Sequence, residues 1–305
     1  MIFSTSTSAF YERARQDMQG LRARAENLQE QLGRGERLGR SSDDPVAASR
    51  LRTLSRADRL TTIDTANADR AATDLTLTDS ALSTFADYII RARELAIQAG
   101  NDTLTAEQRA GIGVELEQIH GNLVSLANAR DSAGHALFGG ITAGHAYTID
   151  GAGNAVYLGT ANAGELSLGE GQSITRGVTG PEFLDYDVGG LPTNIMAVVK
   201  TLGEALGGAV ADPAQGARDA LASLTAGLDA VTTTQTVVGS RLAWIDLTLE
   251  RQIDLGELRA TEEADIGGTD IAGTVAQLQE ILVVLEASQA SFTRLAGVSL
   301  FDNLR

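Results

Sequence analysis

The first part of the chain carries an apolar stripe at the spacing of a coiled coil. Each member follows the previous one by three or four residues, and the stripe consists of Phe10, Ala14, Met18, Leu21, Ala25, Leu28 and Leu32. A repeat near 3.5 residues is typical of helices that pair along a seam. We therefore predict a helix over residues 10–32 whose stripe needs a partner.

A second helix is predicted to begin after the glycine-containing segment 33–44. Asp44 and Pro45 form an N-cap residue followed by a first-turn proline. No glycine or proline follows Val46 until Gly100, so this helix can extend to Ala99 and, at about 1.5 Å per residue, would approach about 80 Å. Its later half keeps an apolar seam, formed by Leu75, Leu82, Phe85, Ile89, Ala92, Ala96 and Ala99.

A capping box and a change in amino-acid composition mark the middle of the chain. Thr105 and Gln108 have the spacing of a capping box, which predicts a third helix with the seam Ile112, Leu116, Ile119, Leu123 and Leu126. After Arg130 the sequence is rich in glycine, and short alternating runs flank "DGAGN". Such runs predict a small set of β-hairpins.

Helical periodicity returns near Ile195. We predict two moderate helices up to about Thr234 and then a long helix with Val238, Leu242, Ile245 and Leu249 on its seam. The last helix has the clearest stripe, formed by Ile271, Val275, Leu278, Leu282, Leu285, polar Gln289, Phe292 and Ala296. Burial of one leucine side chain contributes roughly 1.5 to 3 kcal/mol, so this stripe also needs a partner.

The stripes at the two chain ends are candidates to pair with each other. The predicted fold is mainly α: an elongated antiparallel bundle of long helices, a coiled coil formed by both chain ends, and a small β-rich insertion at the tip. The predicted division is a terminal domain of residues 1–44 and 265–305, a helical rod of 45–139 and 189–264, and an inserted domain of 140–188. Three glycines, each costing a helix roughly 1 kcal/mol relative to alanine, leave the continuity of the last helix open: Gly267, Gly268 and Gly273.

Composition narrows the possible partners. The net charge of −16 disfavours binding to nucleic acid or to an anionic membrane, since both require clustered cations. Aromatic residues make up only 4% of the chain, which suits closely packed helices better than one thick core. The start of the chain lacks a basic region followed by an apolar core, and no stretch approaches the roughly 20 apolar residues of a membrane span. We therefore expect no signal peptide and no membrane insertion.

The chemistry-bearing residues give little sign of a reactive site. Cysteine is absent, which excludes disulfides and thiol catalysis. His135 and His145 could meet across a turn, but they have no organised carboxylate set for a metal, and His120 stands apart. The loop "DGAGN" lacks the alternating carboxylates and the final glutamate of a calcium loop. We expect no catalytic residues, no cofactor and no metal.

Four segments carry a resemblance to a known family. They are "SSDDPVAASRL" near the start, "VGSRLAWIDLTLE", "EEADIGGTDIAGTVAQLQEILVVLEAS" and the ending "VSLFDNLR". Together they resemble the bacterial flagellin superfamily, and within it the hook-filament junction branch. Flagellins themselves usually read Asp-Asp-Ala-Ala-Gly where this chain has "DDPVAAS", and they usually end on Leu-Ser-Leu-Leu-Arg. Both departures favour the junction branch over flagellin.

The resemblance implies a structural subunit that joins hook to filament, with no enzymatic activity. It implies self-association in a helical or tubular assembly, contacts with a neighbouring hook-associated protein and with flagellin, and an export chaperone. It also implies an extracellular location in the flagellum, reached by flagellar type III export. Flagellin, or another coiled-coil structural protein such as an adhesin, remains the alternative. The expected assembly interface, besides the cap Asp44–Pro45, consists of Phe10, Met18, Leu21, Leu28, Leu278, Leu282, Leu285, Phe292, Leu295 and Phe301.

Overall fold

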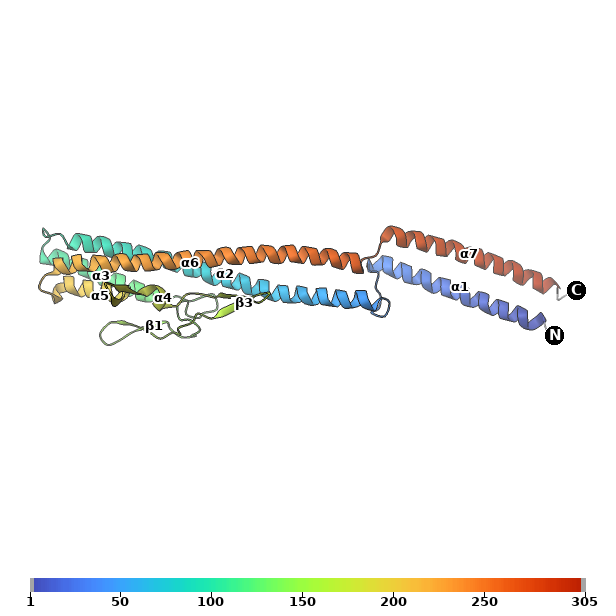
Figure 1. Cartoon of the computed structure of the whole chain (residues 1–305), viewed down its shortest axis with the longest axis horizontal. Helices are drawn as coiled ribbons and strands as arrows, with labels where there is room; N and C mark the ends of the chain where they lie inside the picture. The colour runs from blue at the N-terminus through green and yellow to red at the C-terminus, as the bar shows by residue number, and fades with distance from the viewer. Residues whose placement is uncertain (1–2, 303–305) are drawn as a thin grey trace. The chain divides into compact units, whose positions relative to one another are not determined.

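The computed structural model describes the backbone of residues 3–302 and the side chains of residues 9–294. Helices dominate the chain, and the strands are confined to its middle (Figure 1). The helices are α1 (Phe3–Arg34), α2 (Pro45–Ala99), α3 (Ala106–Ala127), α4 (Gly180–Leu184), α5 (Ile195–Glu204), the π-helical turn η1 (Ala205–Ala209), α6 (Pro213–Gly267) and α7 (Ile271–Asp302). The strands are β1 (Tyr147–Ile149), β2 (Ala155–Tyr157), β3 (Glu165–Gly169), β4 (Gln172–Thr175), β5 (Asp185–Val188) and β6 (Leu191–Asn194).

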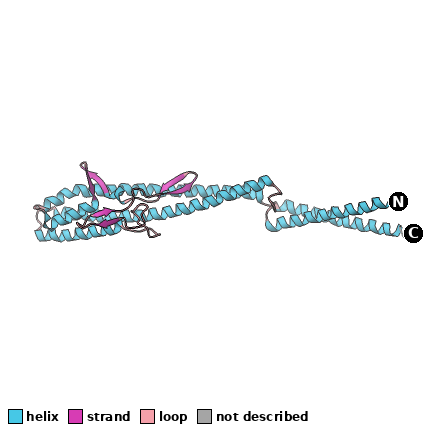
Figure 2. Ribbon diagram, turned by 90° about the horizontal axis from the view of Figure 1, so that it is seen from below, coloured by secondary structure: helices cyan, strands magenta, loops and turns pink. Residues whose placement is uncertain are grey.

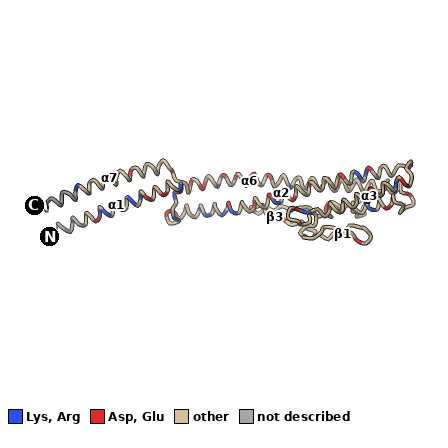
Figure 3. Tube along the Cα trace, turned by 180° about the vertical axis from the view of Figure 1, so that it is seen from behind, with Lys and Arg blue, Asp and Glu red and all other residues tan. Residues whose placement is uncertain are grey.

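The chain folds into two compact units. One is built from the residues up to Arg59 together with those from Asp254 onward, and the other is Leu60–Ile253. The long helices α2 and α6 each contribute to both units. In the first unit, α2 and α6 are joined by ion pairs between Arg50 and Glu262 and between Arg259 and Asp58. Acidic and basic residues are interspersed along both helices (Figure 3), which permits such cross-helix pairs.

Helix α2 begins and ends at the residues that its sequence predicts. The Asp44 carboxylate accepts a hydrogen bond from the Ala47 N–H at 3.0 Å, and Pro45 occupies the first helical position. All seven members of the predicted seam from Leu75 to Ala99 are buried. The capping box of α3 is also confirmed, because the Thr105 side chain accepts from the Gln108 N–H and the Gln108 side chain accepts from the Thr105 N–H. Helix-capping residues and helix-breaking glycine and proline residues therefore determine these boundaries.

The larger unit has a core that α2, α3, α5 and α6 share with the base of the insertion. Three aromatic rings meet inside it: Phe85 of α2 lies 5.8 Å from Phe138 and 5.1 Å from Phe183, measured between ring centroids. All three side chains are fully buried. The residues that enter and leave the insertion are thus fixed in the helical core.

The insertion contains three separate antiparallel hairpins (Figure 2): β1–β2, β3–β4 and β5–β6. The hairpin predicted around "DGAGN" is β1–β2, in which Tyr147 pairs with Tyr157. The insertion is confirmed, but it lies along the sides of α2 and α6 and not at the tip, since β3 accepts hydrogen bonds from Asn67 and Gln252.

One helical prediction is wrong. The second moderate helix and the long helix expected to follow Thr234 are a single helix, α6, which begins at Pro213. Four internal glycines do not interrupt it. Its inward face is continuous across the expected break, with Val231, Thr234, Val238 and Ile245 buried. Burial of this face against the bundle outweighs the weak helix propensity of glycine and threonine.

The cap of α2 gives a direct test. Asp44→Ala should lower the melting temperature slightly and speed amide exchange in the first turn of α2, because the Ala47 N–H loses its acceptor. Asp44→Asn, which keeps the acceptor, is the matched control.

The backbone hydrogen bond from Ala47 holds the pKa of Asp44 below its usual value. The wild type should therefore be more stable than Asp44→Asn near neutral pH, where Asp44 is ionised. This difference in stability should disappear as the pH falls through the pKa of Asp44. Identical exchange in Asp44→Ala and wild type would contradict this assignment.

Candidate assembly interface

The two terminal helices α1 and α7 pack side by side and antiparallel (Figures 1 and 2). At one end of the pair Tyr11 and Phe292 meet edge to face, with ring centroids 5.3 Å apart. The least exposed side chains of each helix recur every three or four residues. They are Tyr11, Ala14, Met18, Leu21, Ala25 and Leu28 of α1, and Thr274, Leu278, Ile281, Leu285, Ser288 and Phe292 of α7. This is the seam geometry of a coiled coil.

The structure places most, but not all, of the expected interface residues on this seam. Met18, Leu21, Leu28, Leu278, Leu285 and Phe292 lie on it. Phe10 and Leu282 lie off it, with 51% and 44% of their surfaces exposed. Leu295 and Phe301 lie outside the side chains that the structure describes. The predicted α7 stripe differs from the seam because α7 is apolar over more than one face, so spacing alone did not select the face that meets α1.

The α1–α7 pair buries little of its apolar surface. Among its described side chains only Ala25 and Thr274 are buried, with 6% and 8% of their surfaces exposed. On α7, Ile271 and Val283 are 64% and 65% exposed. A groove of about 590 Å³ runs between the helices, with Leu21, Leu28, Ile281 and Val284 among its lining residues. Two helices alone thus leave an apolar surface that another helix could cover.

Helix α7 is also apolar and long enough to cross a membrane. Its segment Ile271–Arg294 has a window of mean hydropathy 1.2, which the sequence analysis did not anticipate. A single such helix is weak evidence for a membrane span, because core helices of soluble proteins pass the same test. Glu280 and Glu286 lie within the segment, and a carboxylate near the centre of a bilayer is costly. Its seam with α1 favours packing against protein.

A short backbone bridge joins the two connections of the first unit. Glu36 pairs with Gly268, the Arg37 N–H donates to the Gly267 carbonyl at 2.7 Å, and the Thr269 N–H donates to the Gly35 carbonyl at 3.0 Å. The Arg37 guanidinium also donates to the Ile266 carbonyl at 3.0 Å and contacts the Asp44 carboxylate at 3.4 Å. Arg37 therefore links the end of α6 to the cap of α2.

The three glycines near this bridge have distinct surroundings. Gly267 ends α6, and α7 begins at Ile271, so the helix is interrupted where its continuity was left open. A Cβ at Gly268 would collide with the Ala264 carbonyl oxygen. Gly273 lies in the first turn of α7, where a Cβ would come within 2.6 Å of the Asp270 carboxylate that caps this helix. Gly268 and Gly273 leave room that the turn and the cap require.

The histidines do not gather into a site. His120 is buried on α3, and burial together with the charge of Lys200 lowers its pKa. His135 lies 3.5 Å from Asp131, whereas the His145 side chain is exposed. Within the described residues no three histidine, aspartate or glutamate side chains are grouped as metal ligands.

Comparison with known proteins decides between the structural classes left open by the sequence. A family model described as the bacterial flagellin N-terminal helical region matches residues 5–143. The flagellar hook-associated protein 3 of Escherichia coli is 28% identical over 97% of this chain and 98% of its own length. The chain is therefore similar to members of the flagellin superfamily, and to a hook-associated protein along almost its whole length.

Two further relatives match only part of the chain. The flagellar hook-associated protein 3 of Salmonella typhimurium is 33% identical over 44% of this chain and 43% of its own length. The flagellar filament 41 kDa core protein of Borreliella burgdorferi is 28% identical over 42% of this chain and 38% of its own length. Full-length similarity is thus seen with a hook-associated protein, whereas similarity to this filament protein is partial.

Solved structures share the fold. The flagellar hook-associated protein 3 of Legionella pneumophila superposes with a TM-score of 0.64 at 16% identity, covering 70% of this chain and 98% of that one. The FlgL protein of Bacillus cereus gives a TM-score of 0.57 at 21% identity, covering 70% and 99%. At these identities the likeness shows the fold alone.

Because few side chains of α1 and α7 are buried, we predict that proteolysis of the isolated chain removes its two ends first. In limited proteolysis of the dilute protein, roughly the first 40 and the last 40 residues should be removed while the larger unit persists, because few buried contacts oppose local opening there. Mass spectrometry of the fragments measures this. The same digestion in denaturant identifies the sites that the fold protects, and equal protection of the ends and the larger unit would contradict the prediction.

Proposed function

We propose that this chain is a structural subunit of the bacterial flagellum that joins the hook to the filament and assembles through its terminal helices. The full-length similarity to a hook-associated protein carries the proposal. The incompletely covered faces of α1 and α7 supply the surface for assembly. A filament subunit is the second candidate, and it is less well supported because the full-length match is to a hook-associated protein, whereas the filament relative matches 42% of the chain.

Self-association in a helical or tubular array fits the geometry of the α1–α7 pair. A two-helix pair gains stability when further helices cover its outer faces, and copies of the same chain are the commonest source of such helices. The expected interface residues of α1 and α7, including Leu282 on the open face, are part of this proposal. So is the division into a terminal domain of 1–44 and 265–305, a rod of 45–139 and 189–264, and an insertion of 140–188.

The further partners follow from position in the flagellum. We propose contacts with a neighbouring hook-associated protein on one side and with flagellin on the other. An export chaperone would shield the apolar faces of α7 before assembly, since Ile271 and Val283 are largely exposed. Export through the flagellar type III route would deliver the chain to the outside. We propose no catalytic role, because the resemblance is to structural proteins.

A charge placed on α7 tests the assembly role. Leu282→Asp combined with Leu285→Asp should give protein that is exported but not incorporated, with flagellin lost to the medium and no motility. The reason is that an unpaired carboxylate buried in the assembled state costs several kcal/mol. Melting of the larger unit should hardly change, because both positions lie outside Leu60–Ile253. Electron microscopy of the filaments and blotting of the medium measure the outcome.

A matched control uses exposed polar positions of the same helix. Gln279→Asp combined with Ser291→Asp adds the same charge to α7 without removing apolar surface. This control should retain filaments. Normal filaments in the leucine double variant would refute the role assigned to this helix, and equal loss in both variants would show that added charge alone is responsible.

A further inference from the structure

The hairpin β3–β4 lies across both long helices of the larger unit. Asn67 of α2 donates its side-chain N–H to the Ser167 carbonyl at 3.2 Å, and Gln252 of α6 donates to the Leu168 carbonyl at 2.7 Å. The Leu168 side chain is 1% exposed. Gln252 also accepts from the Thr65 hydroxyl at 2.8 Å. The hairpin and the two helices therefore meet at one level of the molecule.

The hairpin turn approaches α2 closely. Gly169 has a φ of +89°, and a Cβ at this position would collide with the Asp64 carboxylate. On the α6 side, the Arg251 guanidinium forms an ion pair with Glu170 at 2.5 Å. Ala68 and Ala71 of α2, slightly further along, are fully buried although their side chains are small. Leu168 thus supplies a large apolar side chain near a part of α2 whose buried side chains are alanines.

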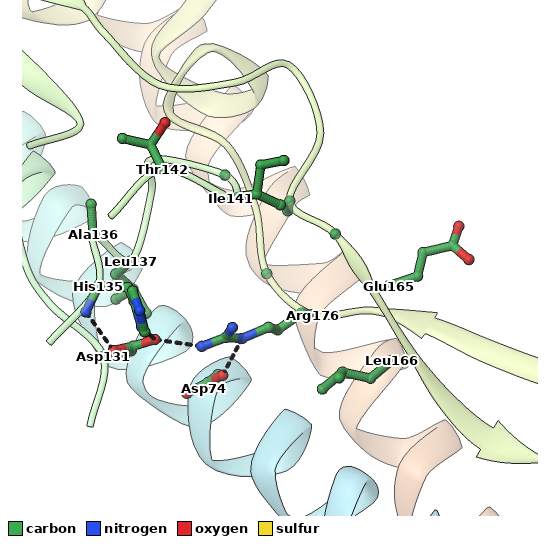
Figure 4. A pocket seen from close by; sticks show the side chains of 14 residues that line it. Asp74, Asp131, His135, Ala136, Leu137, Ile141, Thr142, Glu165, Leu166 and Arg176 are labelled. Carbon is green, nitrogen blue, oxygen red and sulfur yellow. Dashed lines mark hydrogen bonds and ion pairs between the residues drawn. The ribbon is translucent and has the colours of Figure 1, made fainter. Parts of the chain in front are cut away.

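An ion-pair cluster with two buried carboxylates and a partly exposed guanidinium fastens the far end of this hairpin (Figure 4). Arg176 follows β4 directly, and its Nε donates to Asp74 of α2 at 2.7 Å while its Nη2 donates to Asp131 at 2.5 Å. The two carboxylate side chains are each only 4% exposed. Asp131 also accepts from the N–H groups of Ala133 and His135. One guanidinium therefore connects the hairpin to α2 and to the loop after α3.

The charges in this cluster depend on one another. Burial alone would raise the pKa of Asp131, but the hydrogen bonds from His135 and Ala133 and the charge of Arg176 bring it below its ordinary value. Without the guanidinium, two buried carboxylates would face each other with no cation between them. Breaking a buried pair by removal of one partner is strongly unfavourable for the docked state. The docked hairpin therefore depends on Arg176.

The rest of the insertion is held differently. Its base is fixed by the aromatic contacts of Phe138 and Phe183 with Phe85. Outward movement of the hairpin would expose chiefly Leu168 and Ile174, while the aromatic cluster stayed intact. The hairpin is therefore separable from the core to which the insertion is anchored.

We propose that β3–β4 is a strap that closes over α2 and α6 and opens as one unit. The ion pairs of Arg176 with Asp74 and Asp131 hold the strap closed. In the closed state the strap ties together two helices whose own contact at this level is narrow. In the open state residues 165–175 leave both helices, the helices lose a shared partner, and the bundle around Phe85 remains folded.

Hydrogen exchange of an Arg176→Met variant tests the strap. We expect amide exchange in residues 165–175 to rise by about ten- to a hundredfold, with a smaller rise near residues 65–71 and 245–252, and no change near Phe85 and Phe138. Arg91→Met is the matched control, since Arg91 also bridges two carboxylates, those of Glu94 and Glu115, but at an exposed site. Its exchange in residues 165–175 should equal that of the wild type.

An engineered cross-link supplies the second measurement. Because the chain has no cysteine, Asn67→Cys with Ser167→Cys introduces a single reactive pair between α2 and the strap. In the Arg176→Met background, oxidation of this pair should restore protection of residues 165–175, and reduction should remove it.

Each contrary outcome overturns the proposal. Wild-type exchange of residues 165–175 in Arg176→Met would show that Arg176 does not hold the strap closed. Equal loss of protection in the strap and around Phe85, or failure of the oxidised pair to restore protection, would show that the strap does not open as a separate unit. If Arg176→Met does not fold, Asp131→Asn, which removes one charge and keeps one acceptor oxygen for the N–H groups of Ala133 and His135, must show a smaller rise confined to residues 165–175.

Discussion

Two helices that lie side by side can cover only one stripe of each other, and the arrangement of this protein follows from that limit. Where α3 and α5 join α2 and α6, the stripes are wide and the side chains are large, as at Leu75, Leu82 and Phe85. Where those helices end, the β3–β4 hairpin takes the place of a third helix through Leu168. Along α1 and α7 the described chain offers no third element, and the apolar faces stay open. The apolar faces are thus covered most where α3 and α5 pack and least on α1 and α7.

Much of this fold could be predicted because its boundaries depend on local chemistry. Asp44 with Pro45, and Thr105 with Gln108, mark helix starts through hydrogen bonds that span only three residues. The β1–β2 hairpin was equally local. The continuity of α6 was not, because its glycines and threonines argue for breaks and only burial against distant segments overrides them. The three-way domain division has not been tested by the structure, whose compact units are divided differently.

The interface was harder to predict than the fold. On α1 the apolar residues form one stripe, and the seam was found apart from the exchange of Phe10 for Tyr11. On α7 the residues from Ile281 to Leu285 are all apolar, so several faces satisfied the same spacing. The ion-pair cluster of Arg176 gave no signal in the sequence, since its partners are 102 and 45 residues away along the chain. Contacts of this kind are specified only once the helices are in place.

The backbone bridge between residues 35–37 and 267–269 has a consequence for how such chains can change length. Its two strands belong to connections that lie more than 200 residues apart, yet each must reach the other in register, because Arg37 bonds to the Gly267 carbonyl and Thr269 bonds to the Gly35 carbonyl. A residue gained or lost between α1 and Arg37 would shift one segment past the other and leave these donors without acceptors. Insertions and deletions in natural relatives should therefore be rare on either side of the bridge or should occur as compensating pairs, one in each connection, whereas the loops of the insertion are free to vary in length.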